Sequence, residues 1–466
     1  MWAIEYHCEY CKPNHQGRFF KAPDADDLAR YKSAQAGLRR TIKQLPIPDD
    51  EIPTGDETKR LHRWGYTHYR QLFNDRQLLG LGILLTEIQD VADPPIRHAL
   101  LTVFSDFLRY QNLLCRYDTY ALKCQDIFSV HGFPVGLVQC ENNILGIPKV
   151  GSGCYRHFVE KYRKAKEYAQ APFETATQRN RKNLIPTPGE FITANFTESV
   201  PTSGSRNSYL VAGDAASAVL PDDSLDGVFT DPPYFNNVQY AELMDFCYAW
   251  LRPTLAAEFQ AFRPETTRAH EELTGNETMG RGLEHFSYGI SAVFRRFADA
   301  LKQGAPFVFT YHHNDPKAYA PIILGLLDAK LACTQILTVP AEMGASLHIA
   351  RANSSVLDSV FVCRRVGAPA VSIDDASETI MTHLVELERA GLRITKGDIR
   401  CLVAGVVASL AVNELLHRWI DSEAMAAKLD KALETLSRFA NALSALTDVQ
   451  DVQSQVAATR TSAWRP

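Results

Sequence analysis

The residues of this 466-residue chain whose types and spacing are best suited to chemistry form the motif Asp231-Pro232-Pro233-Tyr234. The motif directly follows the apolar run Leu225–Thr230, which predicts a β-strand that ends at the carboxylate. A proline fixes its own φ at about −65° and has no N–H group, so this loop offers carbonyl acceptors without competing donors. Asp231 and these carbonyls can therefore accept hydrogen bonds from one amino group, while the ring of Tyr234 offers a face for stacking.

An Asp-Pro-Pro-Tyr motif after an apolar strand resembles the signature of S-adenosylmethionine-dependent methyltransferases that act on exocyclic amino groups of nucleobases. More specifically, the chain resembles the large adenine-specific DNA methylases that contain a zinc ribbon. This resemblance covers most of residues 1–365. It is carried by the stretches Trp2–Asp24, Phe104–Asn143, Asp231–Leu243, Phe246–Leu251, Phe294–Gly304 and Phe307–His313.

The resemblance implies a specific role for each residue of the motif. The lone pair of an exocyclic amine is delocalised into the base, which makes the nitrogen a poor nucleophile. Asp231 and the carbonyl near Pro232 would bind both amino protons and draw the nitrogen toward a tetrahedral geometry, so that positioning and electrostatics drive an in-line methyl transfer. Tyr234 would stack on the flipped base. The family name implies adenine N6, although the same motif also serves cytosine N4; a proline-rich turn without chemistry is the structural alternative.

Five further residues are predicted to contact the substrate. Phe235, Asn237 and Tyr240 follow the motif and could reach the flipped base or a neighbouring phosphate. His312 and His313 end a later strand, at the carboxyl edge where α/β sheets bind their ligands. A histidine at such an edge can also be a hydrogen-bonded structural group, and that alternative stays open here.

The cofactor that the resemblance implies is S-adenosylmethionine. Gly213 and Asp214 form a Gly-Asp-Ala turn after the predicted strand Tyr209–Ala212. In amino-methyltransferases the corresponding acidic turn lies near the cofactor adenine, so these two residues are predicted to bind the cofactor together with Asp231. The alternative role for Asp214 is to cap the helix that follows it.

The family also holds its cofactor with a Phe-x-Gly-x-Gly loop after the first strand, and the sequence offers no convincing counterpart. Leu79–Gly82 lies inside a predicted helix, and Val150–Cys154 follows a loop instead of a strand. We therefore expect the chain to be the C-terminal half of a split or truncated methylase, with a second subunit that supplies the loop. A catalytically silent module that docks on DNA or on a partner methylase is the alternative.

The cysteines give one incomplete metal-binding pattern. Cys8 and Cys11 have the Cys-x-x-Cys spacing of a zinc knuckle, whereas four-coordinate structural zinc needs two more ligands. The resemblance implies that the partner cysteines precede residue 1, so zinc is expected only as an incomplete site, and a pair of reduced thiols is the alternative. The N-terminus has no basic region followed by an apolar one, which indicates a cytoplasmic protein without a secretory signal.

The amino-acid composition limits the kinds of partner that the chain is expected to bind. The chain has 49 Lys and Arg against 54 Asp and Glu, a net charge of −5, which argues against a protein that coats nucleic acid nonspecifically. No stretch of 18 apolar residues indicates a membrane span. Gly151–Asn183 is the exception in charge, because eight basic residues against three acidic ones give a local balance of +5. We predict DNA as the partner of this segment, with a solvated helix face as the alternative, and the resemblance implies restriction-modification or defence as the setting.

The periodicity predicts an α/β protein in four regions: a zinc-ribbon remnant (1–50), a mainly helical insert for DNA contact (51–200), a methyltransferase catalytic region (205–366) and a C-terminal helical region (367–466). Alternating strands and helices indicate a parallel sheet, here a Rossmann-like methyltransferase sheet without its first strands. The predicted strands are Tyr209–Ala212, Leu225–Thr230, Pro306–Tyr311, Cys333–Val339 and Val356–Cys363. Helices are predicted at Leu78–Leu84, Ala99–Tyr110, Ala241–Leu251, His285–Leu301, Ala318–Ala329, Ile380–Ala390, Asp398–Asp421 and Ala424–Leu446.

Overall fold

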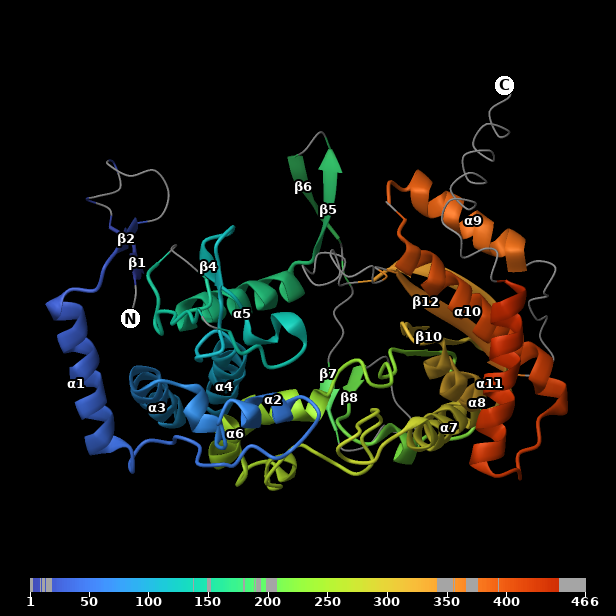
Figure 1. Ribbon diagram of the computed structural model, residues 1–466, viewed down its shortest axis with the longest axis horizontal. Helices are drawn as coiled ribbons and strands as arrows, with labels where there is room; N and C mark the ends of the chain where they lie inside the picture. Colours follow the sequence, from blue (N-terminus) through green and yellow to red (C-terminus); the bar gives the residue numbers. More distant parts are fainter. Residues whose placement is uncertain are drawn as a thin grey trace. The chain divides into compact units, whose positions relative to one another are not determined.

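The computed structural model describes residues 3–8, 10, 13, 19–136, 138–148, 152–178, 181–187, 189, 194–197, 208–341, 355, 357–365, 376–392 and 394–443. The chain forms two compact units, and Figure 1 labels most of their helices and strands. Unit 1 comprises Met1–Phe191 and Gln239–His270, and unit 2 comprises Ile192–Val238 and Glu271–Pro466. Each unit is therefore discontinuous in sequence.

Unit 1 is mainly helical, as the periodicity predicted for most of this part of the chain. Its helices are α1 (Ala25–Thr41), α2 (Thr58–Arg63), α3 (Asp75–Gln89), α4 (Pro94–Leu108), α5 (Tyr155–Gln170) and α6 (Tyr240–Leu255). Its strands pair as antiparallel hairpins: β1 (Ile4–Tyr6) with β2 (Phe19–Lys21), β3 (Tyr117–Asp118) with β4 (Lys123–Cys124), and β5 (Phe173–Gln178) with β6 (Arg181–Pro186).

Helix α6 belongs to unit 1 although it begins just after the Asp-Pro-Pro-Tyr motif. The buried carboxylate of Glu242 accepts hydrogen bonds from the backbone N–H groups of residues 56–58, at 2.9, 2.8 and 3.2 Å, where α2 begins. The ring of Phe73 lies 5.6 Å from Phe246 and 5.2 Å from Trp250, measured between centroids. A carboxylate at a helix start and a cluster of buried rings both stabilise this association. The predicted catalytic region 205–366 is therefore interrupted by a segment that folds with the N-terminal part.

Unit 2 contains a four-stranded sheet in the order β11, β12, β10, β9. The strands are β9 (Val228–Thr230), β10 (Phe307–Tyr311), β11 (Leu331–Pro340) and β12 (Leu357–Arg365). Only β9 and β10 are parallel; β12 runs antiparallel to both β10 and β11. The prediction of a parallel sheet is thus wrong for two of its three strand pairings, both of which involve β12. Consecutive strands such as β11 and β12 can pair directly with each other only in the antiparallel direction when a short connection joins them. The sheet is mixed.

The predicted strand Tyr209–Ala212 does not join this sheet. Strand β8 (Ser208–Leu210) pairs in parallel with β7 (Ala194–Phe196) as a separate two-stranded sheet. Strand β9 therefore lies at an edge of the four-stranded sheet, and the ring of Phe229 within it is 75% exposed.

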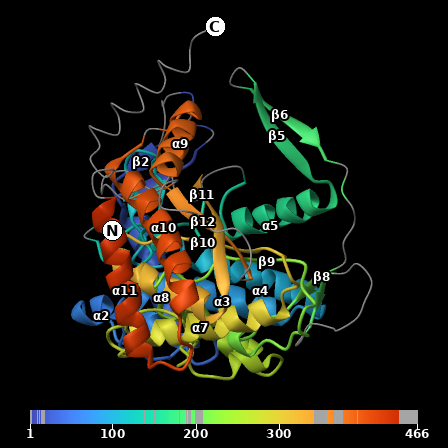
Figure 2. The ribbon, with the colours of Figure 1, turned by 90° about the vertical axis from the view of Figure 1, so that its right-hand side faces the viewer.

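The C-terminal helices share one hydrophobic core with the sheet, so the four predicted regions do not correspond to the compact units. Helices α7 (Leu283–Ala300), α8 (Ala320–Asp328), α9 (Ala376–Arg389), α10 (Lys396–Leu415) and α11 (Met425–Ala442) all contribute to this core. Helix α10 packs against β11 and β12 (Figure 2). Across the sheet, the rings of Phe309 and Phe361 stack at 4.9 Å between their centroids.

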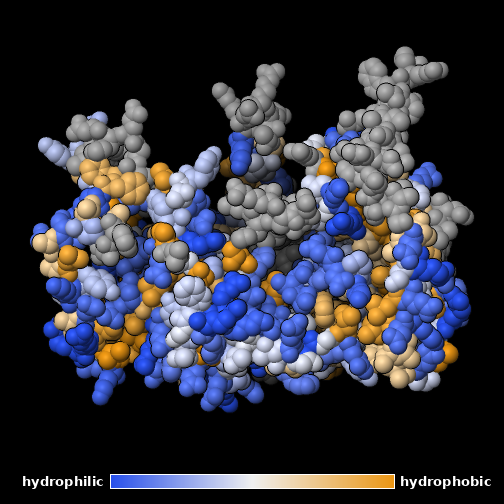
Figure 3. Space-filling view, viewed as in Figure 1, coloured by the Kyte–Doolittle hydropathy of each residue, from blue (hydrophilic) through white to orange (hydrophobic). Residues whose placement is uncertain are grey.

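Among the residues that the structure describes, the segment Lys396–Arg418 is long and apolar enough to cross a membrane by length and composition alone. In the structure 72% of its most apolar window is buried, mostly within the core of unit 2, as expected for the central helix of a globular core. On the face drawn in Figure 3, hydrophilic and apolar residues are interspersed.

Candidate functional site

The Asp-Pro-Pro-Tyr motif forms the loop at the carboxyl end of β9. The carboxylate of Asp231 is exposed, and its Oδ1 accepts a hydrogen bond of 2.5 Å from the hydroxyl of Thr310. Thr310 lies near the carboxyl end of the neighbouring strand β10, whose residue Phe309 is level with Thr230. Parallel pairing of the two strands therefore brings this hydroxyl to the motif and orients the carboxylate.

Tyr234 is the last residue of the motif, and its hydroxyl lies close to Asp231 and Thr310. Burial raises the pKa of Tyr234, while a hydrogen bond with Thr310 opposes that rise. The tyrosine is thus a neutral hydroxyl group at pH 7. Its half-buried ring lies edge-on against Tyr311, at 5.2 Å between centroids. The ring is therefore held in place by packing within the protein.

The residue after the motif has an unusual backbone. Phe235 has φ +36°, a region that non-glycine residues rarely adopt. Its carbonyl accepts a hydrogen bond of 2.9 Å from the N–H of Gly275, and a Cβ on Gly275 would lie 2.6 Å from the Phe235 ring. This close approach requires glycine at position 275. Because the Phe235 ring packs on Phe286, at 5.4 Å between centroids, its main contact is internal packing.

His313 connects the motif loop to β10. Its Nδ1 lies 3.0 Å from the backbone N–H nitrogen of Asp315 and 3.2 Å from the carbonyl oxygen of the same residue, so the amide oxygen of Asn236 beside Nε2 is what assigns the proton to Nε2. Nε2 then donates to Oδ1 of Asn236 at 3.0 Å. Burial lowers the pKa of His313, so the imidazole is neutral at pH 7. The histidine thus positions the loop two residues beyond Tyr234.

His312 faces a thiol from a distant part of the sequence. Its Nδ1 lies 3.1 Å from Sγ of Cys401, on α10. Burial, together with the adjacent His313, lowers the pKa of His312 to about 4. Burial raises the pKa of the Cys401 thiol to about 12. Both groups are therefore neutral at pH 7, and the pair is not an activated thiolate.

These two histidines line a cavity of about 550 Å³ in unit 2. Its polar lining consists of His312, His313, Asn314, Tyr319, Arg400 and Cys401. Its apolar lining consists of Pro316, Val403, Ala404, Val407, Leu436 and Ala440. The cavity thus has apolar walls with a few converging polar groups, the usual composition of a small-molecule site.

The other predicted site residues lie elsewhere. Asn237 is exposed in a turn, where its N–H donates to the carbonyl of Tyr234 at 2.9 Å. Tyr240 is the first residue of α6 and belongs to unit 1. Gly213 and Asp214 form an exposed turn after β8, in which Oδ1 of Asp214 accepts the N–H of Ala216 at 3.0 Å and caps a 3₁₀ turn (Ala215–Ser217). The structure therefore shows the capping role for Asp214.

The sequence analysis did not predict several residues of the site. Thr310 carried a signal, because a polar residue near the carboxyl end of a strand next to the motif strand is well placed for function. Tyr319, Arg400 and Cys401 carried none, since Tyr319 belongs to no motif and the other two lie in a helix predicted to belong to a separate region. Only the packing of α10 onto the sheet brings the last two to the cavity.

The basic segment of unit 1 forms α5 and the β5–β6 hairpin, and part of its charge is neutralised. Arg163 pairs with Glu160 at 2.7 Å and also with Glu167, while Lys161 pairs with Asp106 at 3.1 Å. Arg156 and Lys182 are exposed, whereas Arg179 lies outside the described residues. The net positive surface is therefore smaller than the sequence count of basic residues suggests.

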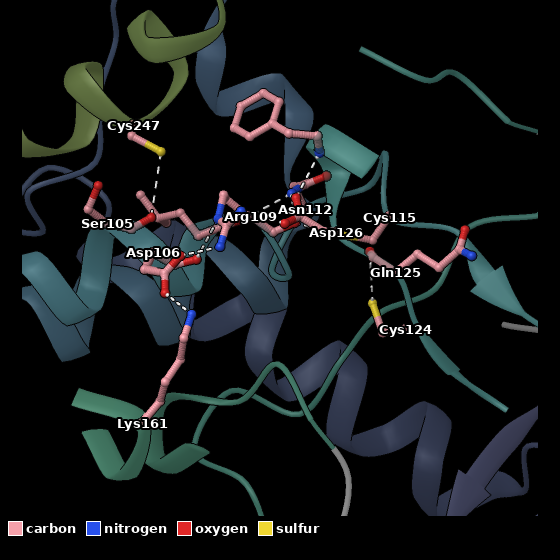
Figure 4. Close-up of polar contacts among 12 residues, drawn as sticks. Ser105, Asp106, Arg109, Asn112, Cys115, Cys124, Gln125, Asp126, Lys161 and Cys247 are labelled. Atoms are coloured by element: carbon pink, nitrogen blue, oxygen red, sulfur yellow. Dashed lines mark hydrogen bonds and ion pairs between the residues drawn. The ribbon is translucent and has the colours of Figure 1, made fainter. Parts of the chain in front are cut away.

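A polar cluster joins the end of α4 to the segments that follow it in unit 1 (Figure 4). Arg109 donates from Nη1 to Oδ2 of Asp126 at 2.6 Å and also pairs with Asp106. Asp126 in turn caps the turn Ile127–Val130 by accepting the N–H of Phe128 at 2.7 Å. Each carboxylate thus has a partner, and the cluster is explained as structural support.

The predicted zinc ligands are only partly described. Cys8 is half-buried and forms no disulfide in the described part of the chain, and Cys11 lies outside the described residues. Hydrogen bonds with the thiols of Cys115 and Cys140, together with burial, raise the pKa of Cys124, so this thiol stays protonated. Among the described residues, no group of three or more His, Cys, Asp or Glu side chains is placed to hold a metal ion. These residues therefore give no support to a zinc site.

Comparison with known proteins gives one distant similarity. The chain is 24% identical over 176 residues to the uroporphyrinogen-III C-methyltransferase of Saccharomyces cerevisiae, which covers 34% of this chain and 26% of that protein. The aligned part is thus about a quarter of the length of this methyltransferase. No protein-family model matches the chain, and no solved structure matches it.

Proposed function

We propose that this chain is an S-adenosylmethionine-dependent methyltransferase whose Asp231–Tyr234 loop binds an exocyclic amino group of a nucleobase, with adenine N6 in DNA as the target atom. The observation that carries the proposal is the exposed carboxylate of Asp231 at the carboxyl end of β9, held by the hydroxyl of Thr310. A carboxylate fixed at this edge of a parallel strand pair is well placed to bind a ligand. The similarity to a methyltransferase supports the general class of reaction.

Residues in and around the motif have separate roles in the proposed reaction. Asp231 accepts a hydrogen bond from one N–H of the amino group, and a carbonyl of the two prolines accepts one from the other N–H, which draws the nitrogen toward a tetrahedral, attacking geometry. The proton that the methylated nitrogen then releases would pass to water at the exposed carboxylate of Asp231. The hydrogen bond from Thr310 holds the carboxylate in one orientation, so the acceptor needs little reorganisation during the reaction. His313 holds Asn236 and thereby the backbone that follows the motif. Bound S-adenosylmethionine would supply the electrophilic methyl group.

The residues around Asp214 fit such a cofactor only in part. The carboxylate of Asp214 is exposed, and a Cβ on Gly213 would meet nothing within 4 Å, so this turn has room for the hydroxyls of a ribose. One oxygen of Asp214 is already used as a cap. A second subunit with a glycine-rich loop belongs to the proposal as the group that completes cofactor binding. DNA would contact the exposed basic residues of α5 and the β5–β6 hairpin.

The test is methyl transfer to unmethylated DNA by the full chain, with mass spectrometry of the product nucleosides. We expect N6-methyldeoxyadenosine from the wild type and its loss in Asp231→Asn. Asp226→Asn is the matched control, because Asp226 is also exposed but precedes β9 at the opposite end of the strand. Product on cytosine N4 would change the target atom, and unchanged transfer by Asp231→Asn would exclude the proposed role of this carboxylate.

Calorimetry with S-adenosylmethionine tests the second subunit separately. If the isolated chain needs a partner, it should bind the cofactor only after a glycine-loop polypeptide is added. Cofactor binding by the chain alone would remove the second subunit from the proposal.

A further inference from the structure

The cavity beside the motif contains a buried hydroxyl that lacks a well-formed hydrogen bond. Tyr319 is fully buried and lines the cavity, and its hydroxyl oxygen makes no well-formed hydrogen bond within the described part of the chain, where the backbone of His313 is a polar neighbour. A buried polar group without a partner costs about 1–3 kcal/mol, so native proteins rarely leave one unexplained. A ligand in the cavity that bonds to this hydroxyl would explain it.

A cation lies in the same lining. Arg400 is exposed, and it forms no ion pair with any residue that the structure describes. Other arginines of unit 2, such as Arg365 with Asp223 at 2.9 Å, are paired with a carboxylate. A guanidinium offers a planar fork of donors that suits the oxygens of a phosphate. The cavity therefore combines a partly open, partly apolar space with an available binding group for an anion.

The cavity is also connected to the motif loop. His313 lines the cavity, and the same imidazole donates from Nε2 to Asn236, two residues after Tyr234. Its ring centroid lies 6.1 Å from that of Phe235. A ligand in the cavity would thus contact the residue that positions the motif loop.

We propose that this cavity binds one nucleotide, with the planar base between the apolar walls and the hydroxyl of Tyr319, and the phosphate on Arg400. The volume of about 550 Å³ lies in the range of small-molecule sites, which is roughly 300–1,000 Å³. Nε2 of His312 and the amide of Asn314 supply the hydrogen-bonding groups that the edge of a base requires. This assignment rests on the proposed function, since it places the acceptor nucleotide beside the loop that would receive its amino group.

An adenosyl cofactor shares part of this chemistry, because it also joins a planar base to an anionic group. The two sources differ in the anion, which is a phosphate in a nucleotide and a carboxylate in the cofactor. Calorimetry on the full chain with dAMP, dCMP, deoxyadenosine and S-adenosylhomocysteine separates them. We expect the two nucleotides to bind, the nucleoside to bind more weakly, and S-adenosylhomocysteine not to displace the nucleotide. Displacement by S-adenosylhomocysteine would overturn the assignment.

Variants of cavity residues test whether the nucleotide binds in this cavity. Arg400→Gln should weaken dAMP binding about tenfold and leave deoxyadenosine binding unchanged, because a charge-assisted hydrogen bond is lost. Arg389→Gln is the matched control, since Arg389 is an exposed arginine of α9 outside the cavity lining. Ala404→Trp should abolish binding by filling the cavity, with circular dichroism confirming the fold. Equal affinities for the Arg400 and Arg389 variants, or full binding by Ala404→Trp, would overturn the proposal.

The binding assay contains no methyl donor, so it is independent of the proposed reaction. Nucleotide binding that depends on Arg400, combined with no methylation of DNA, would support this site and contradict the proposed function. Methyl transfer that depends on Asp231, combined with no effect of Ala404→Trp on nucleotide binding, would support the function and overturn this site.

Discussion

Thr310 donates a hydrogen bond of 2.5 Å to the carboxylate of Asp231, although the two residues are 79 positions apart in the chain. The bond joins the ends of two adjacent parallel strands, β9 and β10. It gives the carboxylate a fixed orientation, while the carboxylate stays exposed to a ligand.

Thr310→Val should lower the rate of methyl transfer about tenfold, because it removes a hydrogen bond to a charged group without changing the size of the side chain much. The effect should fall on kcat, whereas the midpoint of thermal unfolding changes little. Thr310→Ser keeps the hydroxyl and serves as the control. Equal losses in both variants would show that the methyl group, not the hydrogen bond, matters.

The stability of unit 2 should depend on pH through His312. Its pKa of about 4 in the folded chain is lower than the ordinary value of 6.5, so the unfolded state binds more protons between these values. The free energy of unfolding should therefore be unaffected above about pH 6.5 and should decrease as the pH falls toward 4, by at most about 3 kcal/mol. Urea unfolding at several pH values measures this slope, and His312→Gln should reduce it. An unchanged slope in that variant would assign the effect to other groups.

Glu242→Ala should destabilise unit 1 by about 3 kcal/mol. The substitution leaves three backbone N–H groups at the start of α2 without their carboxylate acceptor. Glu87→Ala is the control, because Glu87 is exposed on α3. Chemical denaturation followed by circular dichroism gives both values. Similar stabilities for the two variants would exclude Glu242 as the anchor of α6.

Gly275→Ala should disturb the motif loop, since the added Cβ would lie 2.6 Å from the ring of Phe235. We expect loss of methyl transfer and a lower melting temperature for unit 2. Gly136→Ala is the control, because its Cβ would meet only the flexible side chain of Arg116 at an ordinary 3.7 Å. Normal activity of Gly275→Ala would mean that the loop can move without consequence.

The double variant Arg156→Gln and Lys182→Gln should weaken DNA binding and lower the salt dependence by about one unit of slope for each lost phosphate contact. Arg163→Gln should have little effect, because Arg163 is already paired with Glu160 and Glu167. Fluorescence anisotropy at several salt concentrations measures both. A larger effect of Arg163→Gln would place the main phosphate contact at Arg163 and contradict the prediction.

The sequence predicted the local elements well. Strand β9 ends directly before Asp231, because an apolar run with β-branched and aromatic residues is followed by two prolines that cannot continue it. The positions of α6, α7 and α11 also agree with the periodicity to within a few residues. These features depend on neighbours in the chain, so local patterns contain the necessary information.

Contacts between distant residues decided the remainder. Glu242 binds backbone groups about 185 positions earlier, which removes α6 from the catalytic region that the sequence predicted as continuous. Arg400 and Cys401 reach the cavity only because α10 packs on the sheet, and β12 makes the sheet mixed by lying between β10 and β11. Burial and hydrogen bonding across the whole fold determine these long-range contacts. The sequence by itself therefore determined the motif and the strand that presents it, while the tertiary structure determined which side chains surround it.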